Sequence, residues 1–133
     1  MKKVMVFGTF DVLHPGHQYL LKKSKELGDE LVVVVARDTT VVKVKGRKPS
    51  FPEEIRKNNL EKLRIANKVI LGETGNKLQV IINENPDIIA LGYDQTHFVE
   101  ELTEKFKDKI LIVKIDSFRP DIYKSSKFKK DIE

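Results

Sequence analysis

Five short apolar runs recur along the chain, and their spacing constrains the fold more than any other feature. They are rich in β-branched residues and occupy residues 3–8, 30–37, 68–72, 86–93 and 109–116. Runs of this kind are typical of strands in a parallel sheet that is covered on both faces. Segments with helical periodicity lie between them. A strand–helix–strand alternation of this length predicts one α/β domain with right-handed crossovers.

The intervening segments carry helix start and stop signals. Pro15 suits a first helical turn and Gly28 suits the position just past a helix, so we expect a helix over residues 15–27. Ser50 and Glu53 have capping-box spacing and indicate a second helix. Its inward face is expected to contain Ile55, Leu60 and Leu63. Further helices are expected at residues 76–85, from about residue 96, and from residue 125 or 126.

These elements together predict the architecture. We expect residues 1–133 to form a single Rossmann-like, doubly wound domain with a five-stranded parallel sheet and helices on both faces. Residues 38–51 are expected to form a long irregular loop, and such loops tend to carry function. Ligands of open α/β sheets bind beyond the carboxyl ends of the strands. This rule gathers residues 8–17, the 38–51 loop, residues 92–95 and residues 119–126 around one crevice.

Composition limits the classes of partner. A net charge of +5 is compatible with nucleic acid, anionic lipid or small anions. The lysines are dispersed and only residues 124–130 form a cluster, so no nucleic-acid partner is expected. No apolar run approaches the roughly 20 residues that span a bilayer, and the lack of cysteine excludes disulfides and thiolate metal sites. We expect a soluble cytoplasmic protein with no membrane partner.

The stretch GTFDVLHPGH, which begins at Gly8, holds two of the three histidines. Gly8 allows a ligand to approach the backbone, and Thr9 and Phe10 can offer backbone N–H groups. The start of the following helix attracts anions through its unpaired N–H groups and its dipole. His14 and His17 are three positions apart and share a face, so both can donate to phosphate oxygens, which favour the protonated rings. Taken singly, either histidine could instead be a cap or a partly buried core residue.

The complete stretch resembles the signature of the nucleotidyltransferase superfamily related to the cytidylyltransferases, whose H-x-G-H motif is here His14-Pro15-Gly16-His17. The resemblance covers essentially the whole chain. It implies transfer of a nucleotidyl group from a nucleoside triphosphate to a phosphate, with release of pyrophosphate. It also implies that His14 and His17 contact the triphosphate and stabilise the pentacoordinate transition state. Asp11 would hold the loop or orient a magnesium-bound water.

Further stretches match the same superfamily. Lys43 and Lys45 resemble its two loop lysines, one for the acceptor phosphate and one for the triphosphate, although solvated lysines are the alternative. Gly92 and Asp94 lie where the superfamily holds the nucleoside. The expected catalytic residues are His14, His17 and Lys43. The expected nucleotide-binding residues are Thr9, Phe10, Asp11, His14, Pro15, Gly16, His17, Lys45, Gly92, Asp94, Arg119, Tyr123, Ser125 and Ser126.

The stretch RPDIYKSS occupies the place of a phosphate-gripping R-T-x-G-I-S-T-T segment. Arg119, Ser125 and Ser126 align with that segment without gaps. Ile122 stands in place of its glycine and Lys124 in place of its first serine. The departures count against cytidine as the base and leave phosphate binding intact.

A closer resemblance within the superfamily indicates which base the nucleotide carries and which phosphate accepts it. ARDTTV, KGRKPSFPEEIR and PDIIALGYDQ are most similar to the archaeal FAD synthases, which transfer AMP from ATP to FMN. Glycerol-3-phosphate cytidylyltransferases, or related cytidylyltransferases with a phosphate acceptor, are the alternative, and a nucleotide sensor without turnover is another. The resemblance implies a homodimer. Mg²⁺ is expected to be held mainly by the triphosphate, with no protein ligand required. Candidate walls for a flavin ring are Phe10, Phe51, Tyr93, Phe118 and Tyr123, although any of them could instead be a core residue.

Overall fold

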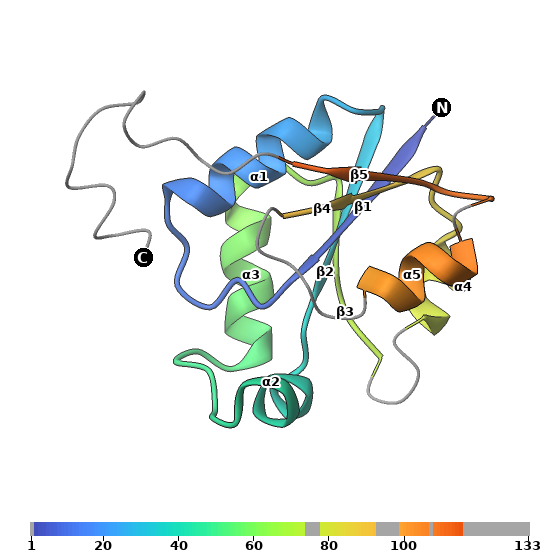
Figure 1. The fold of residues 1–133 in the computed structure, drawn as a ribbon. Helices are drawn as coiled ribbons and strands as arrows, with labels where there is room; N and C mark the ends of the chain where they lie inside the picture. Colours follow the sequence, from blue (N-terminus) through green and yellow to red (C-terminus); the bar gives the residue numbers. More distant parts are fainter. Residues whose placement is uncertain (1, 74–77, 93–98, 107, 116–133) are drawn as a thin grey trace.

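The computed structural model describes residues 2–73, 78–92, 99–106 and 108–115. Five parallel strands form one sheet in the order β3-β2-β1-β4-β5 (Figure 1). The strands are β1 (Lys3–Gly8), β2 (Glu30–Val35), β3 (Lys68–Leu71), β4 (Ile88–Leu91) and β5 (Leu111–Lys114). The helices are α1 (Pro15–Lys25), α2 (Asp38–Lys45), α3 (Glu53–Leu63), α4 (Gln79–Glu84) and α5 (Val99–Phe106). None of these helices is both long enough and apolar enough to span a bilayer.

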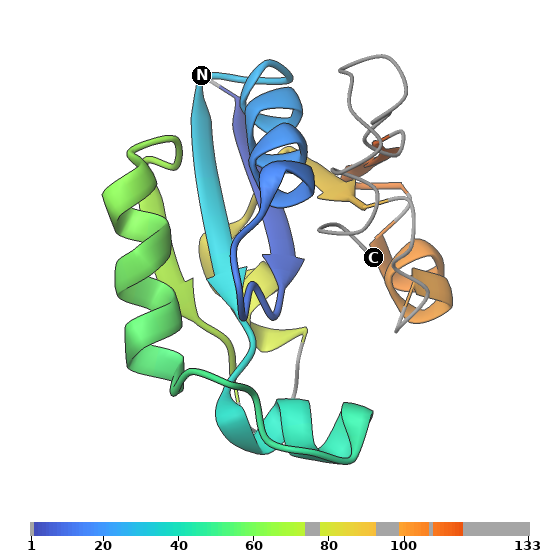
Figure 2. The same cartoon turned by 90° about the vertical axis from the view of Figure 1, so that its left-hand side faces the viewer.

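Helices cover both faces of the sheet, as Figures 1 and 2 show. Successive side chains of a strand point to opposite faces, so each face has its own apolar core. The core under α1 and α3 includes Val4, Val6, Leu21 and Leu60. The core under α4 and α5 includes Met5, Phe7, Ile81 and Leu102. The predicted doubly wound α/β fold is therefore confirmed.

The strand order reverses beside β1. The chain adds β2 and β3 on one side of β1 and then returns to place β4 and β5 on the other. Connections that leave in opposite directions open a crevice at the carboxyl ends of the central strands. Gly8 ends β1 at this edge, and its carbonyl accepts a hydrogen bond from the Ala36 N–H at 2.9 Å. The segment between β1 and α1 thus lies where an α/β sheet binds its ligand.

The prediction of a long loop over residues 38–51 was wrong, because its first part is helix α2. Asp38 lies in the first turn, and Gly46 ends the helix in the left-handed conformation with φ of 76°. Glycine adopts this conformation without steric cost, which makes it a good helix terminator. Val41 is the single residue of α2 that is buried. A helix with so little buried surface has almost no periodic apolar signal, and its β-branched residues obscured the rest.

The predicted capping box at the start of α3 was also wrong. Pro52 is the N-cap residue, and no side chain caps the helix. The Ser50 N–H donates to the carboxylate of Asp11 instead. Glu53 accepts a hydrogen bond from the Asp38 N–H at 2.7 Å. A capping box would have paired the Ser50 N–H with the Glu53 carboxylate. In the structure both groups bond to residues from other parts of the chain instead.

The inward face of α3 differs from the prediction at one position. Leu60 is buried and Leu63 packs against the same core, as expected. Ile55 is 42% exposed, and its neighbour Arg56 is completely buried. Arginine is rarely buried unless its donors are paired. Four oxygen acceptors surround this guanidinium, which is why the polar residue displaces the apolar one.

Glu84, at the end of α4, ties that helix to two strands. Its carboxylate accepts hydrogen bonds from Lys68 Nζ at 2.9 Å and from Lys3 Nζ at 3.3 Å. The Lys68 hydrogen bond is the main cause that holds the pKa of Glu84 below its usual value, although partial burial opposes the shift. A carboxylate with a depressed pKa stabilises the fold above its unfolded pKa, and this contribution is lost as the pH falls through the folded pKa.

We expect Glu84→Gln to lower the free energy of unfolding by about 1 kcal/mol at pH 7, because a paired charge is lost. Urea unfolding at pH 7 and at pH 3 measures the effect, which should largely vanish at the lower pH. Glu61→Gln is the matched control, since Glu61 forms an exposed pair with Lys57. This control should change stability by less than about 0.5 kcal/mol. An equal loss for Glu84→Gln at both pH values would contradict the charge-based explanation.

Candidate functional site

The two imidazoles of the H-x-G-H motif stack on each other at the start of α1. Their ring centroids are 3.9 Å apart and the planes make an angle of 19°. His14 is the N-cap residue, and its Nδ1 accepts a hydrogen bond from the Gly16 N–H at 3.1 Å. Pro15 is the first residue of the helix. The shared direction predicted for His14 and His17 is therefore present.

The cap also fixes the tautomer of neutral His14. A neutral imidazole has one N–H and one acceptor nitrogen, and the Gly16 N–H occupies the acceptor. The ring proton of neutral His14 must then reside on Nε2. His14 can donate from Nε2 without losing its role as the cap.

Phe10 supports the second imidazole from behind. Its ring lies edge-on to His17, with centroids 5.3 Å apart and an interplanar angle of 66°. The backbone of Phe10 is left-handed, with φ of 51°, which is uncommon for an aromatic residue. A Cβ atom on Gly8 would lie only 2.6 Å from Cε2 of Phe10. Gly8 therefore makes room for this ring, whereas the sequence analysis expected it to make room for a ligand.

His17 is a neutral group in the unliganded protein. Its Nδ1 is buried and has no hydrogen-bond partner among the described residues. Burial, followed by the proximity of His14 and Lys45, lowers the pKa of His17 from 6.5 to about 4. Protonation in the presence of a phosphate, which the sequence analysis expected, would thus require the ligand to raise this pKa.

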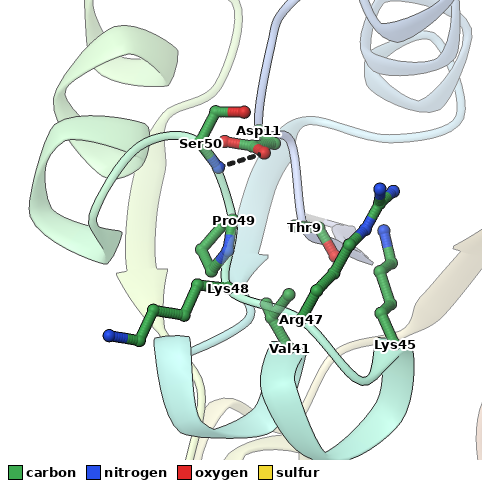
Figure 3. A pocket seen from close by; sticks show the side chains of 8 residues that line it. All are labelled: Thr9, Asp11, Val41, Lys45, Arg47, Lys48, Pro49 and Ser50. Carbon is green, nitrogen blue, oxygen red and sulfur yellow. Dashed lines mark hydrogen bonds between the residues drawn. The ribbon is translucent and has the colours of Figure 1, made fainter.

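Lys45, the last residue of α2, lines a pocket between α2 and the segment that follows β1 (Figure 3). The lining residues are Thr9, Asp11, Val41, Lys45, Arg47, Lys48, Pro49 and Ser50. In Figure 3 the heads of Lys45 and Arg47 extend in the same direction, while Lys48 points away. The structure thus brings Thr9, Asp11 and Lys45 together. It does not place Lys43 in the lining.

Sequence reasoning missed Arg47 as a member of this pocket. With residues 38–51 expected to form one loop, the sequence predicts roles for Lys43 and Lys45 and gives Arg47 no distinct position. With α2 ending at Gly46, the chain turns and brings Arg47 back beside Lys45. The run KGRK, in which a glycine separates basic residues, was the available signal.

Asp11 ties the segment after β1 to the segment before α3. Its carboxylate accepts hydrogen bonds from the Ser50 N–H at 2.6 Å and the Phe51 N–H at 2.9 Å. Burial acts to raise the pKa of Asp11, but these backbone N–H groups outweigh it, and the net pKa is lower than usual. The geometry fits the first of the two roles considered for Asp11, holding the loop.

Arg56 is the second residue near the site that sequence reasoning missed. Its guanidinium donates to the carbonyl oxygens of Thr9 at 2.9 Å, Ala36 at 2.7 Å and Phe51 at 2.9 Å. It also donates to the Asp38 carboxylate at 2.7 Å. Of these acceptors, Thr9 lines the pocket, Phe51 follows the lining residue Ser50, and Asp38 begins helix α2, which supplies Val41 and Lys45 to the lining. The sequence pattern gave no signal of this role, because Arg56 lies outside the expected inward face of Ile55, Leu60 and Leu63.

Other expected site residues are only partly covered by the structure. Gly92 is buried and directly follows β4, the neighbour of β1. Phe10 is part of the apolar core, and Phe51 is 39% exposed. The following candidates lie outside the described residues: Tyr93, Asp94, Phe118, Arg119, Ile122, Tyr123, Lys124, Ser125 and Ser126. The helix expected from residue 125 or 126 also lies outside them.

The low pKa of His17 has a consequence that NMR can measure. We expect its carbon-bound ring protons to titrate near pH 4 in the unliganded protein. Between pH 6.5 and 4 the unfolded chain binds a proton that the folded chain rejects, so His17 should destabilise the fold as the pH falls through this window. An anion bound beside this ring would raise the midpoint, because it favours the imidazolium. A midpoint near 6.5 without ATP would contradict the burial of this ring.

Comparisons with known proteins identify the family of this chain. A family model described as cytidylyltransferase-like matches residues 5–132. A curated relative from Thermoplasma volcanium, named FAD synthase, is 42% identical over 135 residues, which cover 99% of this chain and 94% of the relative.

Two solved structures are also similar. One is described as a lipopolysaccharide core biosynthesis protein from Thermoplasma volcanium, with a TM-score of 0.83 and 43% identity over 90% of this chain and 99% of that one. The other, a protein of unknown function from Archaeoglobus fulgidus, has a TM-score of 0.70 and 21% identity over 87% of this chain and 90% of that one, and it shows the fold alone. The full-length match to the family model and the 42% identity lead to one conclusion: this chain belongs to the cytidylyltransferase-like family.

Proposed function

We propose that this chain is an FMN adenylyltransferase, which transfers AMP from ATP to FMN and yields FAD and pyrophosphate. One observation carries the choice of substrates: the similarity to a FAD synthase extends over 99% of the chain at 42% identity. The site supports the reaction class independently. Two stacked imidazoles at a helix N-terminus, with Lys45 close to His17, suit a triphosphate better than an uncharged ligand.

The triphosphate is proposed to lie between the start of α1 and the end of α2. The N-terminus of α1 attracts anions through its dipole and its backbone N–H groups. Lys45 and Arg47 provide positive charges in the pocket that Thr9 and Asp11 also line (Figure 3), and Lys45 lies close enough to His17 to lower its pKa. Arginine can hold two phosphate oxygens at once, and lysine acts as a point charge that adapts to the moving phosphates.

The proposed reaction is a single in-line displacement. A phosphate oxygen of FMN forms a bond to the α-phosphorus of ATP while the bond to the bridging oxygen of pyrophosphate breaks, and that oxygen keeps the electron pair. The attacking oxygen already carries negative charge, so no general base is required. His14, His17 and Lys45 stabilise the charge that grows on the phosphoryl oxygens, with His14 donating from Nε2.

The described part of the pocket fits a metal bound through the substrate. Its charged lining consists mainly of basic side chains, and both carboxylate oxygens of Asp11 accept backbone hydrogen bonds. Mg²⁺ keeps several waters and binds triphosphates with few protein ligands. When bound, it would neutralise charge on the phosphates and orient them.

The remaining assignments are part of the same proposal. Gly92 and Asp94 would hold the adenosine, and Arg119, Tyr123, Ser125 and Ser126 would contact the phosphates. Lys43 would meet the acceptor phosphate from α2. A homodimer is proposed from the family resemblance, a single domain over residues 1–133 from the chain length, and a cytoplasmic location from the composition.

Product analysis tests the proposed substrates. We expect FAD and pyrophosphate to accumulate when the protein is incubated with Mg²⁺, ATP and FMN, and no flavin product to form with CTP. Parallel reactions contain CTP with glycerol 3-phosphate, and either nucleotide with a sugar phosphate, since one similar structure is described by lipopolysaccharide core biosynthesis. If CDP-glycerol or a nucleotide sugar is the main product, the acceptor is glycerol 3-phosphate or a sugar phosphate, and the assignment of FMN is wrong. ATP binding without any product would favour a nucleotide sensor.

Three single substitutions test the proposed machinery. We expect His17→Ala and Lys45→Ala each to reduce kcat by about 10²-fold, because each removes a donor to the transition state. Lys43→Ala is compared with Lys45→Ala on the same helix. Since Lys43 is exposed and outside the pocket lining, its loss should appear mainly in the KM for FMN. An unchanged kcat for His17→Ala would remove this ring from the mechanism.

A further inference from the structure

We infer that Arg56 is a positioning residue, which holds Lys45 at its working distance from the imidazole pair. This inference rests on the proposed function, because the assay that tests it measures turnover of the proposed reaction. The main support is that Arg56 has the one completely buried guanidinium among the described residues. This group hydrogen-bonds to segments on both sides of the pocket. Arg56 itself is absent from the pocket lining, so it acts through other residues.

The four acceptors of Arg56 come from separate parts of the chain. Thr9 belongs to the segment between β1 and His14, and Ala36 follows β2. Phe51 lies just before α3. Asp38 is the first residue of α2, the helix that ends at Lys45. One side chain therefore connects the histidine segment to the lysine helix.

Only a guanidinium can make these contacts together. Carbonyl groups beyond the ends of β1 and β2 have left the strand ladder, and a buried carbonyl without a donor costs free energy. Arginine offers five N–H donors in a fixed planar fork, and here three of its nitrogens reach four oxygens. A lysine ammonium presents all its donors from one atom, so it cannot span the same acceptors.

Polar contacts, rather than apolar packing, fix the position of α2. Val41 is the single buried residue of this helix. Its first turn is held by the Arg56–Asp38 ion pair and by Glu53, which accepts from the Asp38 N–H and from Arg37. Asp38 thus has partners on two residues of α3. With so little apolar surface to lock it, α2 depends on these contacts for its orientation.

Small changes at Asp38 are magnified at the other end of the helix. Lys45 lies seven residues further on, about 10 Å along the helix axis at 1.5 Å per residue. A tilt of about 10° at the first turn would therefore shift Lys45 by about 2 Å. Displacements of about 1 Å can reduce turnover by about 10²-fold when a reaction depends on positioning.

A double-mutant cycle tests this inference. We expect Arg56→Lys to reduce kcat by about 10²-fold at a temperature where the variant is fully folded. Once Lys45 is absent, its position no longer matters. In the Lys45→Ala background the further loss from Arg56→Lys should therefore be about tenfold smaller than in the wild type. Equal losses in both backgrounds would overturn the inference.

Leu60→Ala is the matched control. Leu60 is buried on the same helix, packs against the sheet core and has no contact with the pocket. It should lower the midpoint of urea unfolding at least as much as Arg56→Lys does, with kcat unchanged. If Leu60→Ala reduces kcat as strongly as Arg56→Lys, general loss of stability explains both, and the positioning role is wrong.

A second variant covers the case in which Arg56→Lys does not fold. Asp38 is 42% exposed in its side chain, so Asp38→Asn should fold while weakening the same link to α2. We expect Asp38→Asn to reduce kcat less than Arg56→Lys does. This loss should also be smaller in the Lys45→Ala background than in the wild type. Full activity for Asp38→Asn would show that this link does not position Lys45.

Binding measurements separate this inference from the proposed function. The same cycle is read by calorimetry as the dissociation constant for ATP with Mg²⁺. A wild-type protein that binds ATP but makes no FAD refutes the acceptor assignment alone. The coupling between Arg56 and Lys45 should still appear in ATP affinity, and its absence there would refute the positioning role.

Discussion

The candidate site depends on a feature of the sheet that lies outside the H-x-G-H motif: β1 is flanked by strands that the chain reaches in opposite directions. Connections above β1 diverge, and the carboxyl end of this strand stays open to a ligand. The segment after β1 must then turn sharply to enter α1. Phe10 makes this turn with a left-handed backbone, and its ring fills the space that Gly8 leaves. The H-x-G-H motif is placed by that turn.

The charges in this region influence one another closely. The imidazoles stack closely, and burial keeps His17 neutral, which avoids repulsion between adjacent cations. Lys45 contributes to the low pKa of His17, so these groups already influence each other before any ligand binds. A triphosphate would reverse this balance, because its charge stabilises protonated imidazole and ammonium together. The unliganded site is therefore poised to gain from phosphate binding.

Sequence patterns predicted the sheet well and the polar scaffold poorly. The β-branched runs were long enough to mark all five strands, and GTFDVLHPGH marked the segment in which two imidazoles stack at the start of α1, because both signals are local. Helix α2 was missed since it buries only Val41, and the expected capping box was wrong since Ser50 and Glu53 bond to distant residues. Burial of Arg56 was unpredictable from periodicity, because its four partners are assembled only by the fold.

The central claim is that the triphosphate of ATP binds between the start of α1 and the end of α2. A crystal structure with Mg²⁺ and a non-hydrolysable ATP analogue tests it most directly. The account predicts phosphate oxygens within hydrogen-bond distance of both imidazoles of the motif and of Lys45. A triphosphate bound away from these three groups, with the histidine rings still packed on each other and on Phe10, would contradict it.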